Sequence, residues 1–334
     1  AGAIVDNLAK GAKIVLGGEN TAADLADLIG AGDLTVNVKD SGAGSANDVI
    51  AINVNSKVGV TTADDSDLNI ANIETVNITA SSANAGVTHN FAGAVNLTHA
   101  LTINVTADTA GLTLGDLDAL ALVDFNASAS TKAVSITTGA DTFTAAAGTA
   151  FKLGAGNDTL NLTGATGGNT ANNADATKGY DFVINGGKGG DAITLAVAAA
   201  ANKDLLVYAA GDSLAGVTNG ANNFDTITNF DVANDKIDLK AFGFSGTAIA
   251  DLAVGAVATV DTTSLMVNAA SQANFFGAGA NQRAIVYVDL GADSALYIDS
   301  NKDGSFQAGT DVVIKLAGIE EDQTGLTVAN FVFA

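Results

Sequence analysis

The stretch from Gly186 to Leu195, Gly-Gly-Lys-Gly-Gly-Asp-Ala-Ile-Thr-Leu, decides the expected fold. Its glycines permit tight turns with positive φ and expose backbone carbonyls. Asp191 adds a carboxylate, and Ile193 begins a short strand whose side chain points inward. Calcium takes roughly six to eight oxygen ligands, more than one such turn supplies. Two stacked turns can supply them, so the stretch predicts a fold in which stacking and metal binding depend on each other.

Nearby stretches repeat this glycine-rich nonapeptide, which is typical of calcium-binding parallel β-rolls. Gly154 to Leu160 lacks only the first glycine, and Gly139 to Phe143 keeps the second half. Asp141 and Asp158 lie seventeen residues apart, close to the roughly eighteen residues of a roll turn made of two nonapeptides. We expect both carboxylates to face one row of ions. The run from Gly164 to Gly179 is expected to be an inserted loop.

Weaker echoes of the pattern occur at Gly211-Asp212 and from Asn223 to Ile227, where ordinary turns before strands explain the residues equally well. The candidate calcium ligands are turn glycines, carboxylates and neighbouring polar residues. They are Asp141, Gly154, Gly156, Asn157, Asp158, Gly186, Lys188, Gly189, Asp191, Asp212, Asp225, Asp235, Asp299, Asn301 and Asp303.

In this order of motifs the sequence resembles the C-terminal half of RTX proteins exported by type I secretion. The likeness is closest to RTX surface-layer proteins and to the segment after the calcium repeats of serralysin-type proteases. It rests on Phe224 to Asp231 with Asn234 to Leu239, on Ala295 to Gly304, and on the apolar tail Leu326 to Ala334. Asn330 stands where the family often has an acidic residue. The resemblance implies a Gram-negative bacterial source, the type I secretion machinery as a partner, and folding on contact with external calcium.

Composition excludes several classes of function. Lys plus Arg number 14 against 36 Asp plus Glu, for a net charge of −22. This charge argues against nucleic acid and anionic membranes as partners. The excess carboxylates also repel one another in the folded chain unless cations neutralise them. Because the chain has no cysteine, disulfides and thiol chemistry are excluded. Aromatic residues make up only 5%, which suits thin stacked strands.

The first 135 residues place asparagine repeatedly between two apolar residues, as in Val76-Asn77-Ile78 and Ile103-Asn104-Val105. This period-two alternation predicts short strands of a β-solenoid, with apolar side chains inside and asparagine ladders outside. Leu68 to Thr79 resembles a phrase that recurs in RTX surface-layer and adhesin proteins. Asp24 to Ile29 and Thr263 to Phe276 are candidate short helices.

The expected fold class is therefore all-β, a parallel β-solenoid or β-roll with short helices as caps. Three domains are expected. Residues 1–135 would form solenoid repeats, residues 136–240 a calcium-binding roll with its inserted loop near 164–179, and residues 241–334 a C-terminal cap with the secretion signal.

Catalytic motifs are missing from the sequence. His89 and His99 do not form the His-Glu-x-x-His frame of a zinc protease, and we expect both to be exposed. There is no Gly-x-Ser-x-Gly elbow and no phosphate-binding loop. Polysaccharide lyases and epimerases also use parallel β-helices, but the basic groups that assist their carboxylates are scarce here. We therefore expect no enzyme activity, and a lyase or epimerase is the least favoured alternative.

The stretch from Asp299 to Gly304 also resembles the opening of an EF-hand loop. A full loop wants a bidentate glutamate at its twelfth position, where this chain has Thr310 followed by Asp311. Two interpretations stay open, an acidic turn that binds one calcium and a purely structural turn.

The favoured function is an extracellular structural protein that folds with calcium and self-assembles into a surface layer or matrix fibre. Its expected partners are other copies of itself, with cell-surface polysaccharide as a further candidate. It would be secreted to the cell surface or matrix without a cleaved N-terminal signal. The alternative is the calcium and secretion domain of a larger secreted adhesin or hydrolase.

Overall fold

The computed structural model describes residues 3–17, 32–39, 47–62, 66–139, 148–165, 179–197, 202–218, 221–244, 253–255, 260–277, 283–319 and 326–333. By its internal contacts the chain divides into two compact units, residues 1–182 and residues 183–334. The three domains expected from the sequence were defined by type of repeat, which this division does not test, so they stay a prediction.

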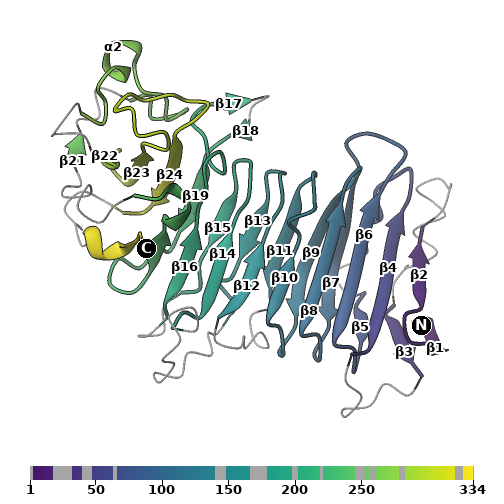
Figure 1. The fold of residues 1–334 in the computed structure, drawn as a ribbon. Helices are drawn as coiled ribbons and strands as arrows, with labels where there is room; N and C mark the ends of the chain where they lie inside the picture. The colour runs from purple at the N-terminus through teal and green to yellow at the C-terminus, as the bar shows by residue number, and fades with distance from the viewer. Residues whose placement is uncertain are drawn as a thin grey trace. The chain divides into compact units, whose positions relative to one another are not determined.

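The first unit is built of parallel coils whose successive strands alternate between two sheets (Figure 1). One sheet has the order β1 (Ala3–Leu8), β3 (Leu34–Val38), β5 (Leu68–Ile70), β7 (Thr88–Asn96), β9 (Gly111–Asp118), β11 (Val134–Thr138) and β13 (Thr159–Asn161). The other has the order β2 (Lys13–Leu16), β4 (Val49–Asn55), β6 (Thr75–Ser81), β8 (Thr102–Ala107), β10 (Asp124–Asn126) and β12 (Thr149–Lys152). β14 (Phe182–Asn185) begins at the last residue of this unit.

Inward side chains stack in register from coil to coil. One row, with every member fully buried, runs through Ile50, Val76, Ile103, Phe125 and Phe151. Because each coil is too thin to bury these side chains alone, the core exists only between coils. The all-β parallel roll expected from the sequence is thus confirmed by the strand pairing itself.

Outward asparagines form the expected ladders. Asn104 pairs with Asn77 and donates from Nδ2 to its Oδ1 over 2.9 Å, and Asn96 donates likewise to Asn69 over 2.7 Å. Coils of the first unit are longer than the roughly eighteen residues expected for the roll turn around Asp141 and Asp158. Thr75 pairs with Thr102, a step of 27 residues, and Ser135 pairs with Thr159, a step of 24 residues. The 27-residue coil contains β6 and β7, with seven and nine residues, which are longer than the roughly three-residue strands that a nonapeptide holds.

His89 corrects an expectation, because it is fully buried, whereas His99 is exposed as expected. The Nδ1 atom of His89 accepts a hydrogen bond from Val60 N over 3.1 Å, and Nε2 lies 2.9 Å from Ser81 O. These contacts assign the proton to Nε2. Burial lowers the pKa of His89 and outweighs the Ser81 carbonyl, which raises it. The neutral ring therefore forms hydrogen bonds with backbone groups of two different coils.

Replacing His89 by leucine is expected to lower the free energy of unfolding by about 2–4 kcal/mol at neutral pH, because two hydrogen bonds to buried backbone are lost. The pKa of His89 is lower in the folded chain than in the unfolded chain. The stability that neutral His89 contributes is thus present above the unfolded pKa and is lost as pH falls through the folded one. Urea unfolding at about pH 7.5 and about pH 5 should show a larger cost of the substitution at the higher pH.

The exposed His99 provides the control for that comparison. His99→Leu should leave stability at both pH values close to that of the wild type, since surface substitutions change it by about 0.5 kcal/mol or less. An equal cost for His89→Leu at both pH values would show that the ring is not held neutral by the fold.

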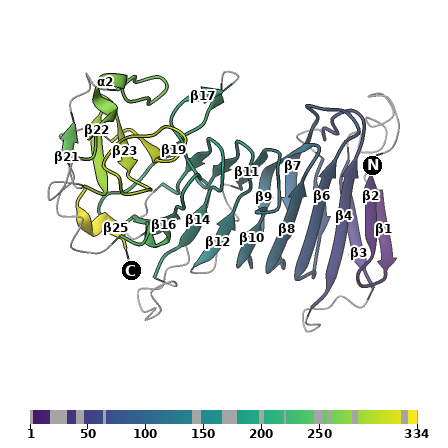
Figure 2. The same cartoon turned by 45° about the horizontal axis from the view of Figure 1, so that its top comes forward.

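The second unit continues parallel pairing in its roll part and adds an antiparallel part. β15 (Ala192–Thr194), β19 (Asp225–Thr228) and β24 (Val312–Ala317) pair in parallel, as do β16 (Asp204–Val207), β20 (Lys236–Asp238) and β25 (Phe331–Val332). Antiparallel pairing joins β24 to β23 (Asp293–Ile298) and β23 to β22 (Ile285–Asp289) (Figure 2). β21 (Ala253–Gly255) pairs in parallel with β22. A small hairpin joins β17 (Val217–Thr218) and β18 (Ala221–Asn222).

Helices in the described residues are short. They are η1 (Lys240–Phe242), α2 (Ala269–Gln272) and η5 (Val328–Asn330). The helix expected from Thr263 to Phe276 is thus limited to four residues, and the one expected from Asp24 to Ile29 lies outside the described residues. Nowhere in the described part of the chain is a helix long and apolar enough to cross a membrane.

The antiparallel strands enclose their own core. Its buried members include Tyr297, Phe276 and Phe306, with Phe275 packed against them. The ring of Phe275 meets those of Phe276 and Tyr297 edge to face, at centroid distances of 5.2 Å in each case. Edge-to-face packing of this kind adds to the stabilisation from burial. The core accounts for the concentration of aromatic residues in the C-terminal part of a chain otherwise poor in them.

Candidate metal centre

The Gly186 turn connects β14 to β15 and has the backbone that the sequence predicts. Gly187 and Gly189 have φ values of 81° and 132°, which favour glycine. Gly187 N donates to Asn185 Oδ1 over 2.8 Å, and Gly189 N donates to Asp212 O over 3.2 Å. The turn is thereby closed on itself and tied to a later segment of the same unit.

Asp191 and Asp225 stand at the beginning of neighbouring parallel strands, and both are buried, with 1% and 0% of their surface exposed. Asp191 N donates to Asp225 Oδ1 over 2.9 Å, and Thr226 N donates to Asp191 O over 2.8 Å. The pairing of β15 with β19 therefore brings together two carboxylates that lie thirty-four residues apart in sequence.

Gly186 lies against both carboxylates. A Cβ atom at this position would collide with Asp191 Oδ2 and would lie 3.3 Å from Asp225 Oδ2. Only glycine therefore leaves room for the two oxygens to approach the turn. Carboxylate and backbone oxygens are the ligands that calcium prefers, so the donor set fits this ion.

The two carboxylates alone do not complete a calcium site. In the described ranges, no group of three or more His, Cys, Asp or Glu side chains is placed to hold a metal ion. The remaining oxygens would have to come from carbonyls of the glycine turns and from other neutral groups, as the nonapeptide pattern predicts.

Asp212 and Lys188 flank this turn. Asp212 is 8% exposed, and its Oδ2 accepts from Ala209 N over 2.7 Å. Burial raises the pKa of Asp212, and the Ala209 N–H and the Lys188 charge partly offset the effect. Lys188 itself is exposed, so the part expected of it at the metal would be played by its backbone oxygen.

The Gly154 turn, in the first unit, holds Asp158 in a different way. Asp158 is buried, and its Oδ1 and Oδ2 accept from Val134 N over 2.7 Å and from Gly154 N over 2.9 Å. Burial raises the pKa of Asp158 to about 6, against the lowering effect of these two N–H groups. A Cβ at Gly156 would lie 2.5 Å from Ala133 N, so this glycine is needed for close approach of the coils. Asn157 is exposed, and Asp141 lies outside the described residues.

The same arrangement recurs at two other aspartates. In each, one carboxylate oxygen accepts from the N–H four residues earlier, and the other accepts from a more distant N–H at a strand or turn. The pairs are Asp231 N and Asp204 N for Asp235, and Gln307 N and Ser300 N for Asp311. Sequence analysis missed this structural role, although an aspartate directly before or near a strand start is a readable signal.

The acidic loop from Asp299 to Asp311 contains three carboxylates, which are not placed as one metal-binding group. Asp299 is buried, and its Oδ2 accepts from Gly304 N over 2.9 Å. Asn301 Nδ2 donates to Asp303 Oδ2 over 3.0 Å. Burial raises the pKa of Asp311 to about 6, and the charges of Asp299 and Asp303 add to the rise. Asp311 was not among the predicted ligands because it stands one place after the expected twelfth position.

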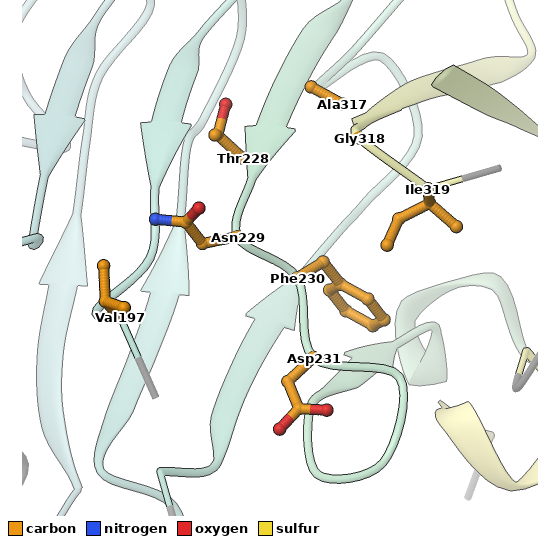
Figure 3. A pocket seen from close by; sticks show the side chains of 8 residues that line it. All are labelled: Val197, Thr228, Asn229, Phe230, Asp231, Ala317, Gly318 and Ile319. Atoms are coloured by element: carbon orange, nitrogen blue, oxygen red, sulfur yellow. The ribbon is translucent and has the colours of Figure 1, made fainter. Parts of the chain in front are cut away.

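A shallow pocket of about 440 Å³ lies elsewhere in the second unit (Figure 3). Phe230 projects from the segment after β19 toward Ile319. The one carboxylate in its lining is Asp231, which accepts from Ala233 N over 2.9 Å and from Asn234 Nδ2 over 2.8 Å. The lining is Val197, Thr228, Asn229, Phe230, Asp231, Ala317, Gly318 and Ile319.

The C-terminal stretch expected to resemble a secretion tail packs as β25 beside β20, with Phe331 opposite Ile237. Asn330, which stands where the RTX family often has an acidic residue, is 2% exposed and donates from Nδ2 to Val232 O over 2.8 Å. The burial of Asn330 and its hydrogen bond to Val232 O thus give a structural explanation for an asparagine at this position. Whether the stretch also directs secretion stays a prediction.

No protein-family model and no curated protein sequence matches the chain. Among solved structures, it is similar to the solution structure of the AlgE6R3 subunit from the Azotobacter vinelandii mannuronan C5-epimerase. The match has 17% sequence identity and a TM-score of 0.33, and covers 61% of this chain and 79% of that chain. The assignment of a parallel β-roll rests on the strand pairing described above.

Proposed function

We propose that this chain is an extracellular structural protein that folds with calcium and self-assembles into a surface layer or matrix fibre. The observation that carries the proposal is the convergence of Asp191 and Asp225 on the Gly186 turn. The proposal includes no catalytic activity.

Electrostatics supports a cation at this place. Two carboxylates held close together away from water repel each other, and each disfavours ionisation of the other. A divalent cation between them attracts both carboxylates. It also neutralises their negative charge, which is costly to bury without a partner of opposite sign. Because the two strand starts meet only in the folded roll, the free energy of binding contributes to folding.

The outer face of the first unit supports assembly. Strands β4, β6 and β8 contain no charged residue in a chain whose net charge is −22. The outward positions of β6 and β8 carry threonine, asparagine and serine, including the Asn77–Asn104 ladder, and those of β4 carry Val49, Ala51, Asn53 and Asn55. Copies of an acidic protein approach with least repulsion through such a neutral face, and in-register ladders favour stacking of sheets.

Export by type I secretion from a Gram-negative cell is part of the proposal. It rests on the stretches that resemble RTX proteins and on the absence of cysteine, which suits folding that needs no oxidation. The alternative role, as the calcium and secretion domain of a larger adhesin or hydrolase, would share the same metal chemistry and would differ in assembly.

Electron microscopy of the purified chain tests the proposal. At millimolar calcium we expect ordered sheets or fibres, and excess chelator should dissolve them with loss of β-sheet circular dichroism. Magnesium at the same concentration should not replace calcium, because it prefers a smaller, octahedral shell that keeps its waters. A chain that folds with calcium but stays monomeric would overturn the assembly proposal and favour the domain of a larger protein.

A further inference from the structure

Tyr208, which no prediction singled out, has an unexplained hydroxyl. It directly follows β16 and is 2% exposed, yet its hydroxyl forms no hydrogen bond of normal geometry. A buried polar group without a partner costs about 1–3 kcal/mol. Such a group in a native fold calls for a ligand, a water or a functional reason.

The charges of three carboxylates act on this hydroxyl. Burial raises the pKa of Tyr208 well above its ordinary value, and the charges of Asp225, Asp191 and Asp212 raise it further. A side-chain hydrogen-bonding contact with Asp225, outside the normal geometry of a hydrogen bond, raises the pKa of Tyr208 as well.

The backbone holds Tyr208 in this place. The next residue, Ala209, donates from N to Asp212 Oδ2 over 2.7 Å, and Gly189 N of the Gly186 turn donates to Asp212 O over 3.2 Å. The segment from Tyr208 to Asp212 is thus fastened to the same turn that brings Asp191 and Asp225 together.

We propose that the Tyr208 hydroxyl is a neutral oxygen of the cation site whose charged oxygens come from Asp191 and Asp225. The inference rests on the proposed calcium function and names a residue outside the nonapeptide pattern. The phenol oxygen offers lone pairs to the cation, and its proton is donated to a neighbouring carboxylate. A neutral ligand adds an oxygen without adding to the negative charge that the cation must balance.

Terbium luminescence provides the test, because Tb³⁺ prefers oxygen ligands as calcium does and is excited by energy transfer from a nearby aromatic ring. The chain has no tryptophan and four tyrosines, so transfer from a tyrosine can be assigned by substitution. The proteins to compare are the wild type, Tyr208→Phe, and Tyr180→Phe as a half-buried control that belongs to the first unit. Calorimetric titration with calcium chloride gives the affinity of each protein.

We expect strong sensitised emission from the wild type and from Tyr180→Phe. Tyr208→Phe should lose most of this emission and bind calcium about tenfold more weakly, the factor for one lost interaction with a charged group. Far-ultraviolet circular dichroism in calcium checks that the variant folds. Asp225→Asn, which keeps the Tyr208 ring, should lose emission by losing the ion.

Two results would overturn the inference. Wild-type calcium affinity and emission in Tyr208→Phe would make Tyr208 a core residue and leave the calcium proposal intact. The absence of calcium and terbium binding by the wild type would overturn both proposals together.

Discussion

A chain carrying both Asp191→Asn and Asp225→Asn is expected to be at least as stable as the wild type in excess chelator and to gain almost nothing from calcium. The two carboxylates are buried and converge on the Gly186 turn, so without a cation they repel each other. Asparagine keeps their shape and removes that repulsion. The same change removes the charges that calcium binds.

Urea unfolding with and without calcium measures this effect. At a calcium concentration a thousandfold above the dissociation constant, one site should raise the wild-type free energy of unfolding by about 4 kcal/mol. The double variant should gain less than about 0.5 kcal/mol. Asp33→Asn with Asp108→Asn is the matched control, because it removes the same charge from exposed positions. Equal calcium gains in all three proteins would place the ion elsewhere.

Replacing Phe151 by alanine is expected to destabilise the first unit by about 3–5 kcal/mol. Phe151 is fully buried, and its ring lies 5.8 Å from that of Phe125 and 6.0 Å from that of Phe182. A thin coil offers few side chains that can collapse into the cavity, because each inward row is one residue wide at every coil. The loss should therefore lie near the upper end of the usual range.

Denaturant unfolding of the full chain measures this loss, and Phe151→Leu should cost less than half as much because it keeps most of the volume. Leu120→Ala, at a 44% exposed position, is the control and should cost about 0.5 kcal/mol or less. A loss below about 1 kcal/mol for Phe151→Ala would show that the aromatic row is not part of a cooperative core.

Much of the roll could be predicted from the sequence because most of its strands are short and alternate between inward apolar and outward residues. Val76, Asn77 and Ile78 show in three letters which side chains face the core and which face solvent. The coil length could not be predicted from the nonapeptide, because it depends on which strands pair. The pairing of Thr75 with Thr102 is a property of the tertiary structure and cannot be deduced from a local sequence pattern. The antiparallel strands β22 to β24 are nearly continuous buried runs, and such runs suit either direction of pairing.

The metal centre could be predicted in part. The Gly186 turn and Asp191 belong to a clear local pattern. Asp225 belongs only to a weak echo of that pattern, and the pairing of β19 with β15 places it beside Asp191. Tyr208 lies seventeen residues after Asp191 and has no motif, so only the fold brings it to the carboxylates. The same limit of local sequence patterns applies to His89. The residues around it look like those of an ordinary strand and do not show that the histidine is buried with two backbone partners.

Asp158 and Asp235 show why a carboxylate in the right pattern is not by itself a ligand. Each already accepts two backbone N–H groups, one from its own turn and one from a more distant part of its unit. Their metal role stays a prediction, since a cation would have to share or replace these bonds. Asp191 and Asp225 differ because an oxygen of each is directed at a glycine that leaves room for it.

A crystal structure of the chain grown in calcium, with anomalous scattering recorded at long wavelength, tests the central claim most directly. The account predicts a calcium peak between Asp191 and Asp225, with oxygens of both carboxylates at about 2.3–2.6 Å from the ion. A well-ordered Gly186 turn without such a peak, at a calcium concentration that saturates the protein, would contradict it.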